Sequence, residues 1–493
     1  MTGSGPAPAS SGPVSAGPGP APAGPGPAPT GSGPAPTKPG LAAALRAALD
    51  RELADAVRLR RELHAAPELS GSEYKTAARV AEALGEPEAP QVAGTGRLVR
   101  IGPADGPCVA VRAELDALPV VEQTGVPWAS ANGAMHACGH DVHLAALAAL
   151  GRAARNVAAT DGLPAAMLAV LQPREEAYPS GALDIAASAA FTAQRPAAVI
   201  AAHLQHQVPP GTVSAAPGTV NASVDDFEIL IEGTAGHAGY PHLAVDPVPA
   251  LCQAVLALQQ IASRRTDPTH AVVVSVGMLQ AGQATNVIPG SASARGTLRA
   301  LDPADRPLLR DWLREIAEHT ARSYGCRATV TIEESEPALV NSEPLAAASW
   351  PVLREAGFGI DTSFRSCGAD DFSFYSPVAP ILMLFVGSGG AFTLHHPEFL
   401  PPDEAVGQVA TVMLAGYLAA LTLLLFALSL ARPHALPRAT PRSPSRDPTL
   451  SPRDATSMYR RAAKNEPIRT SMSAVGGRVS GGSGRWAVHS KTI

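Results

Sequence analysis

The chain has 493 residues, of which 46% are hydrophobic, and its formal net charge is −5. This length suits two or three domains, and the apolar fraction is sufficient for a sizeable core. The slightly acidic balance excludes the strongly basic class of nucleic-acid-binding proteins, so we expect no nucleic-acid partner.

The cysteines and the first residues bear on the cellular compartment. Five cysteines are scattered along the chain, which does not suggest a disulfide framework. The first residues contain neither the basic nor the apolar stretch of a secretory signal. We therefore expect a reducing, cytoplasmic location.

Residues 1–40 consist almost entirely of Pro, Gly, Ala, Ser and Thr, with one charge at Lys38. Such a segment cannot bury enough apolar surface to offset its chain entropy. We expect a disordered arm, and the composition leaves open a linker or docking tail.

Residues 41–221 have the pattern of the first part of an α/β catalytic domain. Leu41–Ala65 places apolar residues at helical spacing, which predicts an amphipathic helix. Short apolar runs then alternate with helical stretches, at Val109–Arg112, Ala166–Leu171 and Val199–His203. This alternation predicts a mostly parallel sheet flanked by helices.

Residues 222–335 change to the order strand, helix, strand, strand, helix, strand, which is that of a ferredoxin-like unit. The predicted elements are Asp226–Glu232, Pro247–Arg264, Ala271–Leu279, Ser291–Leu298, Asp305–Tyr324 and Ala328–Glu333. We expect a small α+β domain inserted into the larger one.

The α/β pattern resumes over residues 336–431, which form the second part of the catalytic domain and end in an apolar helix after Pro402. Beyond it, residues 432–493 are rich in Arg, Ser, Pro and Thr. This composition predicts a disordered basic tail.

The uncharged run Ala405–Ala431 is long enough to span a membrane. Gly407, Gln408 and Gly416 interrupt its first half, which suits a packed core helix. The arginines that follow would favour a cytoplasmic tail, so the catalytic domain would have to cross the membrane with no signal ahead of it. We interpret the run as a core helix with an apolar extension rather than a span, and we expect no membrane partner.

The segment Met135–His143 carries the strongest chemical pattern. Cys138 and His140, two residues apart in a turn with glycine, can both reach one cation of the Zn²⁺ type. Asp141 stands where it can cap the Ala/Leu-rich helix that follows. The alternative is a loop with a structural cysteine and buried histidines, which we would favour for any one of these residues alone.

Glu175 and Glu176 directly follow the apolar strand Ala166–Leu171. The carboxyl ends of such strands are where α/β sheets place their ligand sites. One carboxylate can bind a metal while the other takes a proton from metal-bound water. The alternative, an exposed pair of loop charges, is the commoner meaning of adjacent glutamates.

Two histidines complete the candidate set. His203 ends the strand that begins at Val199, and His395 follows the last buried strand, Ile381–Val386. Each is a weak indication by itself. Two metal ions that share a bridging water require about five protein ligands, and the candidate set supplies five. They are Cys138, His140, Glu176, His203 and His395.

The inserted domain contributes hydrogen-bond donors at His237, Asn286 and Arg299. Donors of this kind stabilise a developing oxyanion and hold a substrate carboxylate. Residue type alone leaves the alternatives open: His237 as a turn residue and Arg299 as an exposed strand end.

With these motifs in order, the chain resembles the superfamily of hippurate hydrolase, indole-acetyl-amino-acid hydrolases, aminoacylase-type enzymes and glutamate carboxypeptidases, and most closely the hippurate hydrolase branch. The resemblance runs from about Arg60 to about Ala420. The motifs are Arg61-Glu62-Leu63-His64, Pro67-Glu68-Leu69, Arg112 to Pro119, His136 to Asp141, Glu175-Glu176, Gly236-His237-Ala238, Pro241-His242, Asn286-Val287-Ile288-Pro289, Asp370-Asp371-Phe372 and Leu394-His395.

The resemblance implies a role for each candidate residue. The five side chains would bind two divalent ions (Zn, Mn, Co or Ni), Glu175 would be the general base, and Asp116 would orient a ligand. His237, from this subunit or its partner, would bind the oxyanion, and Asn286 and Arg299 would contact the substrate. It also implies a homodimer in which the small domain serves as lid and dimerisation domain.

Four positions depart from the branch. Glu114 stands where it usually has Asp, Asp370 where it has Glu, and Ala202 where a Gly precedes the histidine ligand. His206 stands where a Pro is common and lies close enough to join the substrate pocket.

The sequence therefore predicts a metal-dependent amidohydrolase that cuts the amide bond of N-acyl amino acids or small dipeptides. The alternative is a catalytically silent metal- or ligand-binding protein on the same fold, against which the complete ligand set argues. A zinc deaminase would need the combined signature of His-x-Glu followed by Pro-Cys-x-x-Cys, which the sequence lacks.

Overall fold

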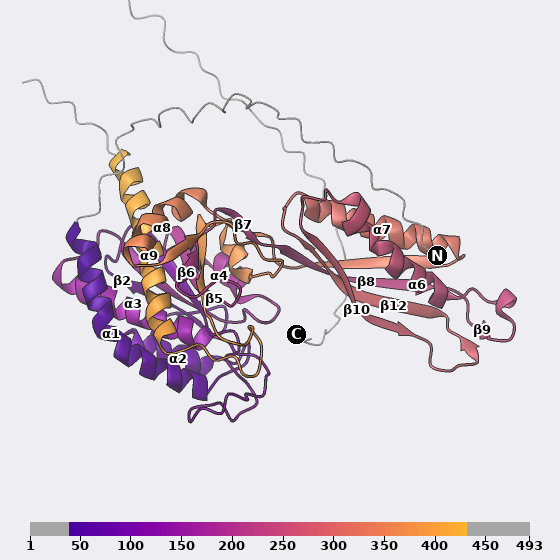
Figure 1. The fold of residues 1–493 in the computed structure, drawn as a ribbon, viewed down its shortest axis with the longest axis horizontal. Coiled ribbons are helices and arrows are strands. Elements are labelled where there is room, and N and C mark those ends of the chain that lie inside the picture. The colour runs from indigo at the N-terminus through magenta and orange to yellow at the C-terminus, as the bar shows by residue number, and fades with distance from the viewer. Residues whose placement is uncertain (1–38, 431–493) are drawn as a thin grey trace, which may run out of the picture. The chain divides into compact units, whose positions relative to one another are not determined.

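The computed structural model describes residues 39–430 (Figure 1). The disordered arm and the disordered basic tail that the sequence predicts fall outside these residues, apart from Pro39 and Gly40, which already belong to the first helix.

The larger sheet has eight strands in the order β1-β2-β4-β3-β5-β16-β6-β15. The four central strands β4, β3, β5 and β16 are parallel to one another, and β1, β2 and β6 add antiparallel pairs toward the edges. The strands are β1 (Gln91–Val92), β2 (Gly96–Ile101), β3 (Cys108–Glu114), β4 (Ala166–Gln172), β5 (Pro196–Gln205), β6 (Thr212–Ser214), β15 (Gly359–Asp361) and β16 (Ile381–Gly387).

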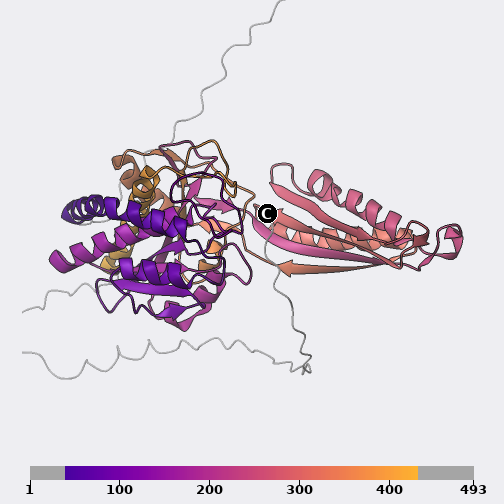
Figure 2. The ribbon, with the colours of Figure 1, turned by 90° about the horizontal axis from the view of Figure 1, so that it is seen from below.

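Helices cover both faces of this sheet, which is why β3, β4 and β16 are buried at every position. One face packs against α1 (Pro39–Ala65), α2 (Tyr74–Ala83), α3 (His140–Thr160), α8 (Glu343–Glu355) and α9 (Glu404–Leu430) (Figures 1 and 2). The other packs against α4 (Gly181–Ala187), α5 (Ala189–Thr192) and the 3-10 helix η3 (Asp371–Tyr375). The predicted α/β architecture is confirmed.

Helix α9 is the one described helix whose length and hydropathy would allow it to cross a membrane, and 67% of its most apolar window is buried in the protein. A side-chain carbon at Gly416 would lie 2.4 Å from Ile200, so this helix lies directly on β5. Tyr417 donates a hydrogen bond to the carbonyl of Ala165 at 3.3 Å. The interruptions in the apolar run thus mark a core helix.

The second sheet has four antiparallel strands in the order β10-β12-β8-β13, and α6 and α7 pack on one of its faces. Its elements are β8 (Ser223–Glu232), α6 (Pro247–Leu258), β10 (Val272–Ala281), β12 (Ser291–Ala300), α7 (Asp305–Ser323) and β13 (Arg327–Glu334). Their order along the chain is the predicted ferredoxin-like one. The helix expected over Pro247–Arg264 instead ends at Leu258, and a π-helical turn η2 (Ile261–Arg265) follows.

Short pairs of strands complete the fold. The ribbon of β9 (Gly236–His237) and β11 (Val287–Ile288) belongs to the segment between β8 and β12, together with the 3-10 turn η1 (Pro241–Leu243). The pair of β7 (Gly218–Asn221) and β14 (Leu339–Asn341) stands at the two points where the chain enters and leaves the four-stranded unit.

Candidate metal centre

The candidate residues lie at one edge of the larger sheet. Parallel strands end at the same edge, so the residues after β3, β4 and β16 and near the end of β5 come together. Asp116 follows β3, Glu175 and Glu176 follow β4, His203 lies in β5, and His395 follows β16.

Cys138 and His140 reach this edge from the start of α3, which begins at His140. The intervening residue, Gly139, has φ 85°, and a side-chain carbon there would lie 2.8 Å from Leu204. Only glycine adopts this backbone conformation at little cost and leaves room for Leu204, so it fixes the spacing of the two donors.

The five predicted ligands form one cluster. Ligand atoms of Cys138, His140 and Glu176 all lie within 4.8 Å of one another. The sulfur of Cys138 is 3.5 Å from Nε2 of His203, and Nε2 of His395 is 3.3 Å from a carboxylate oxygen of Glu176. The structure therefore brings together side chains that are up to 257 positions apart, from Cys138 to His395.

His140 has the hydrogen bonding of a metal ligand. Its Nδ1 donates to the backbone carbonyl of Asp116 at 2.9 Å, while its Nε2 is buried and has no hydrogen-bond partner among the described residues. The Asp116 carboxylate lies beside the ring at 3.5 Å and accepts hydrogen bonds from Ser70 (2.7 Å) and the Glu176 amide (2.9 Å). Asp116 thus orients the His140 ring and holds the backbone of Glu176, the kind of support that metal ligands require.

Glu175 stands between the cluster and a second group of carboxylates. One of its oxygens is 4.0 Å from Nε2 of His140, and it lies within 4.8 Å of Asp370 and Asp371. Its side chain is 12% exposed, so a small molecule can reach it. This is the position that a proton-transferring group beside a metal site needs.

A buried arginine compensates the carboxylates behind the cluster. The Arg112 guanidinium is inaccessible to solvent and contacts Glu114, Asp371 (2.7 Å) and Asp370 (3.5 Å). Burial would raise the pKa of Glu114, but Arg112 and His143 hold it well below its usual range. Burial raises the pKa of Asp371 to about 7, against the attraction of Arg112. Glu114 and Asp370, two of the positions that differ from the hippurate hydrolase branch, therefore face the same guanidinium.

His143 belongs to the same cluster but differs from the predicted ligands. Ligand atoms of Glu114, His140, His143 and His203 lie within 4.8 Å of one another. The amide of Leu204 can only donate, so Nε2 of His143 accepts its hydrogen bond at 3.0 Å, and Nδ1 carries the proton that goes to Glu114 at 2.9 Å. Both ring nitrogens are thereby used, which leaves His143 no lone pair for a cation.

The capping role predicted for Asp141 is wrong. The residue before α3 is Gly139, and no side chain caps the helix. Instead, the buried Asp141 carboxylate accepts hydrogen bonds from Arg60 at 2.8 Å and His64 at 2.9 Å. These partners come from α1, so Asp141 ties the first helix to the start of α3.

The substrate-contact residues predicted in the small domain are not part of the metal-binding cluster. His237 and Asn286 are exposed neighbours on the β9–β11 ribbon, where the Ala238 amide donates to the Asn286 carbonyl at 3.1 Å. His237 contacts its own hairpin: its Nδ1 accepts a hydrogen bond from the Gly239 amide (3.0 Å), and its ring packs against that of Tyr240. Their catalytic and binding roles remain predictions.

Two further substrate predictions also remain untested. Arg299 donates to the carbonyl of Cys367 at 2.9 Å, which links β12 to the loop after β15. His206 is half-buried just after β5, and its Nδ1 has no hydrogen-bond partner among residues 39–430.

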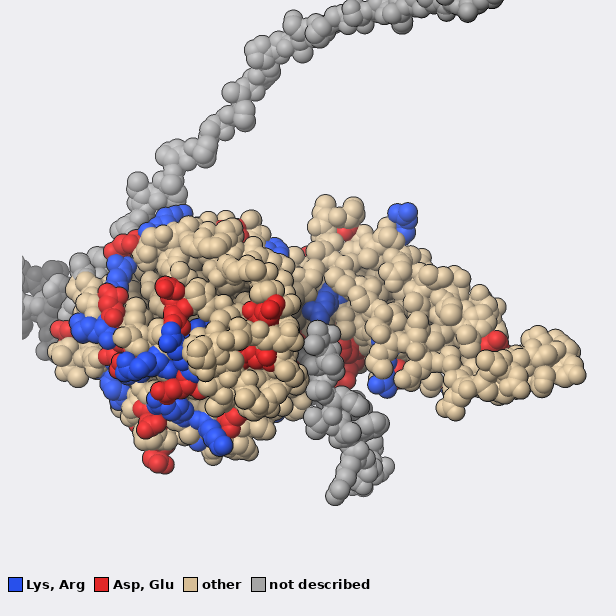
Figure 3. Space-filling view, turned by 60° about the horizontal axis from the view of Figure 1, so that its bottom comes forward, with Lys and Arg blue, Asp and Glu red and all other residues tan. Residues whose placement is uncertain are grey.

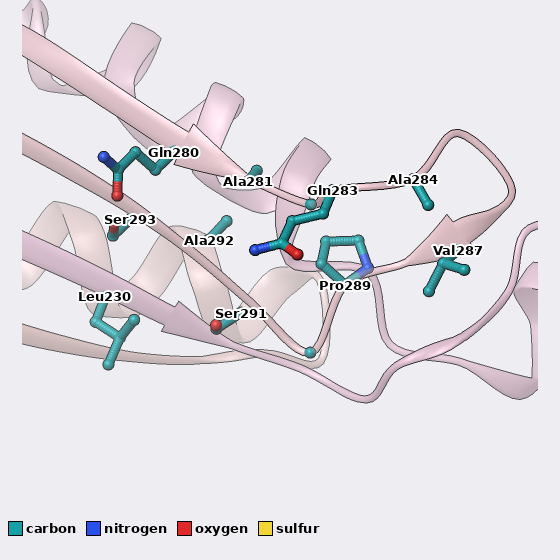
Figure 4. Close-up of a pocket in the computed structure, with 12 residues that line it drawn as sticks. Leu230, Gln280, Ala281, Gln283, Ala284, Val287, Pro289, Ser291, Ala292 and Ser293 are labelled. Carbon is teal, nitrogen blue, oxygen red and sulfur yellow. The ribbon is translucent and has the colours of Figure 1, made fainter.

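A hollow of about 440 Å³ lies beside the Asn286 loop, between the end of β10 and the start of β12 (Figure 4). Its lining includes Gln280, Gln283, Val287, Pro289 and Ser291 but none of the cluster residues. No titratable side chain lines it, so it offers no group for acid–base chemistry. The reactive groups lie instead at the strand ends of the larger sheet.

The sequence patterns did not indicate the roles of three residues of the site: His143, Asp371 and Arg112. One pattern could have indicated Arg112, because a charged residue inside a fully apolar strand needs a buried partner. The positions of His143 and Asp371 depend on contacts made far along the chain.

Comparison with known proteins agrees with this geometry. The family model described as peptidase family M20/M25/M40 matches residues 110–419. An N-acetylcysteine deacetylase of Bacillus subtilis (strain 168) is 34% identical over 357 residues, which cover 71% of this chain and 92% of the relative. An N-acetyldiaminopimelate deacetylase of Bacillus pumilus (strain SAFR-032) is 32% identical over 367 residues, covering 73% and 96%.

Among solved structures, a Bacillus subtilis protein described as a dinuclear metal binding peptidase from the M20 family superposes with a TM-score of 0.63. It is 30% identical, and the match covers 77% of this chain and 99% of that one. The similarity therefore includes both the larger sheet and the four-stranded unit.

Proposed function

The chain belongs to peptidase family M20/M25/M40 and is a metal-dependent hydrolase of amide C–N bonds, and on this basis we propose that it cleaves the amide bond of N-acyl amino acids or small dipeptides. The observation that carries the proposal is the cluster of Cys138, His140 and Glu176 with Glu175 4.0 Å from His140. The two deacetylases named above favour short acyl groups on amino acids as the substrate class.

The donor set fits two divalent cations such as Zn, Mn, Co or Ni. It combines a thiol, imidazoles and a carboxylate, which are the ligands of borderline transition ions, and the buried Nε2 of His140 has no hydrogen-bond partner among the described residues. Burial holds the pKa of His203 well below its usual range, so this imidazole is neutral and competent to bind. Cations bound here would polarise the substrate carbonyl and lower the pKa of water.

Within this proposal Glu175 moves the protons. Its carboxylate accepts a proton from the attacking water and passes it to the nitrogen of the leaving amine. The partial exposure of Glu175 allows both water and amine to approach it. Asp116 keeps His140 in one orientation throughout, since it holds the ring's Nδ1 through its carbonyl.

The test of Glu175 is the substitution Glu175→Gln, assayed on N-acetyl amino acids and hippurate with added Zn²⁺ or Mn²⁺. We expect turnover to fall by about 10²–10⁴-fold, as for loss of a general base, with metal content unchanged near that of the wild type. Glu88→Gln, at an exposed site, is the matched control. A variant with the wild-type rate would refute this role of Glu175.

We further propose that the protein is a homodimer in which His237 acts in the partner's site. Support comes from the edge strand β10, whose Met278 and Leu279 are 50% and 56% exposed, and from the exposure of His237 on its ribbon. Mixing the inactive variants His237→Ala and Glu175→Gln provides the test. Activity would return in mixed dimers if His237 acts across the interface, and would stay absent if it acts within its own subunit.

A further inference from the structure

The last turn of α9 is an apolar surface that the fold leaves uncovered. Phe426, Leu428 and Leu430 are 36%, 44% and 71% exposed, and the stretch contains no charge. The hydroxyl of Ser429 donates to the carbonyl of Phe426 at 2.7 Å, so its polarity is satisfied within the helix. We call Phe426–Leu430 the apolar tip, and Figure 1 shows this end of α9 extending beyond the neighbouring helices.

The chain that directly follows the tip is strongly basic. Residues 431–493 contain twelve Arg and Lys against three Asp and Glu, whereas residues 39–430 contain 25 against 40. On the face drawn in Figure 3, acidic and basic side chains are interspersed over the part that holds the larger sheet. Positive charge is thus concentrated in the part of the sequence that follows the tip.

We infer that the apolar tip and the basic residues 431–493 together bind this protein peripherally to an anionic lipid surface. Apolar insertion or basic charge alone gives weak, reversible membrane binding, and the two combined give stable anchoring. Here the two signals are adjacent in the chain. This inference differs from the expectation of no membrane partner, and it is independent of the proposed substrate.

The depth of the tip suits the membrane interface and not a span. Five helical residues rise about 7 Å, against about 30 Å for the hydrocarbon core of a bilayer. The preceding part of α9 cannot contribute, because Gly416 and Tyr417 are packed against β5 and Ala165. About 5–10 Å is the usual depth of an interfacial helix, where water and headgroups still reach the last helical carbonyls.

Docking by the tip leaves the candidate metal centre open to solutes. The start of α9 lies near the start of α3, which carries His140, because Asp403 accepts a hydrogen bond from Arg60 (2.9 Å), which also donates to Asp141. The other end of this 27-residue helix lies about 40 Å away at 1.5 Å per residue. A lipid-bound chain therefore still binds soluble substrates.

Vesicle flotation of the full chain tests the inference. The probes are vesicles of phosphatidylglycerol and phosphatidylcholine in equal parts, and vesicles of phosphatidylcholine alone. We expect binding to the anionic vesicles only, weakened by added NaCl because salt screens the basic segment. Absence of binding to anionic vesicles, or equal binding to both kinds, would overturn the inference.

Two sets of variants separate the signals. The double substitution Leu428→Glu with Leu430→Glu, and the triple change of Arg438, Arg442 and Arg446 to Gln, should each lower partitioning on the order of tenfold or more. Leu308→Glu, at a leucine on α7 that is 44% exposed, is the control and should bind as wild type.

Activity on soluble substrate and the melting temperature should be unchanged in all of these variants. If either set of variants bound vesicles as wild type does, the two-signal anchor would be wrong. It would also be wrong if light scattering showed that the tip joins two copies of the chain while neither binds lipid.

Discussion

Replacing Arg112 with Met tests the charge balance behind the metal centre. Methionine keeps much of the side-chain length but removes the guanidinium that contacts Glu114, Asp370 and Asp371. Each of the three carboxylates is at most 6% exposed, so water cannot replace the lost partner.

The size of the stability loss in Arg112→Met depends on the hydrogen bonds that each carboxylate keeps. Asp371 keeps hydrogen bonds from Gln172 and Ser180, and Glu114 keeps His143, so these groups do not become fully unpartnered. Breaking a buried ion pair by removing one partner costs about 3–5 kcal/mol. That is a large part of the about 5–15 kcal/mol that stabilises a typical fold.

The penalty should depend on pH with a defined sign. Arg112 holds down the pKa of Asp371, which burial has raised to about 7, so in Arg112→Met this pKa rises further. Above about pH 7 the wild-type carboxyl is ionised, while the folded variant still retains a proton that its unfolded state releases. The variant therefore loses up to about 1.4 kcal/mol more for each pH unit between about pH 7 and its own folded pKa.

Urea unfolding in the presence of a chelator, at about pH 6 and about pH 9, measures this difference without metal linkage. Arg79→Met, which removes an exposed ion pair with Glu62, should cost less than about 1 kcal/mol at both pH values. A penalty for Arg112→Met below about 1 kcal/mol, or one that does not grow with pH, would refute the reasoning.

Three further predictions concern other parts of the molecule. Asp225→Asn should lower the free energy of unfolding by about 3 kcal/mol, because Arg306 and Arg310 bond to this buried carboxylate. Burial raises the pKa of Asp225, but the two arginines outweigh burial and lower it. Denaturant titrations should therefore show the full difference above about pH 4 and a smaller one below it. His143→Ala should lower kcat/KM or metal affinity by about 10–100-fold while Zn²⁺ stoichiometry stays the same, and loss of one ion per chain would make His143 a ligand instead. Burial raises the pKa of the Cys138 thiol, so Zn²⁺ added to protein freed of metal by a chelator should release protons. Calorimetry in buffers of different ionisation enthalpy should show this release as a binding heat that depends on the buffer. A heat that does not vary with the buffer would contradict the prediction.

The strands of the larger sheet could be predicted because their burial leaves a direct record in the sequence. Runs such as Ala166–Leu171 and Ile381–Val386 are apolar at every position, which a strand covered on both faces requires. The short strands β6 and β15, next to and at one edge of the sheet, have no such run and were not predicted. The turn η2 was missed because its residues continue the helical spacing of α6, and nothing local shows the change of hydrogen bonding.

The candidate ligands could be predicted from residue type and from their place after buried strands. The contacts that orient them could not, because each joins distant segments. Asp141 illustrates this: its position favoured a helix cap, but Arg60, 81 residues earlier, supplies a stronger charged partner. Likewise, the use of both ring nitrogens of His143 depends on where β5 ends relative to α3.

The tight turn at Gly139 has a consequence for how the protein tolerates mutation. A methyl group there would push on Leu204, the neighbour of His203, while straining the backbone between Cys138 and His140. One alanine would therefore disturb donors on two separate elements at once. In a saturation library selected for activity, we expect this glycine to be invariant, while the alanines along the rest of α3 accept other small residues.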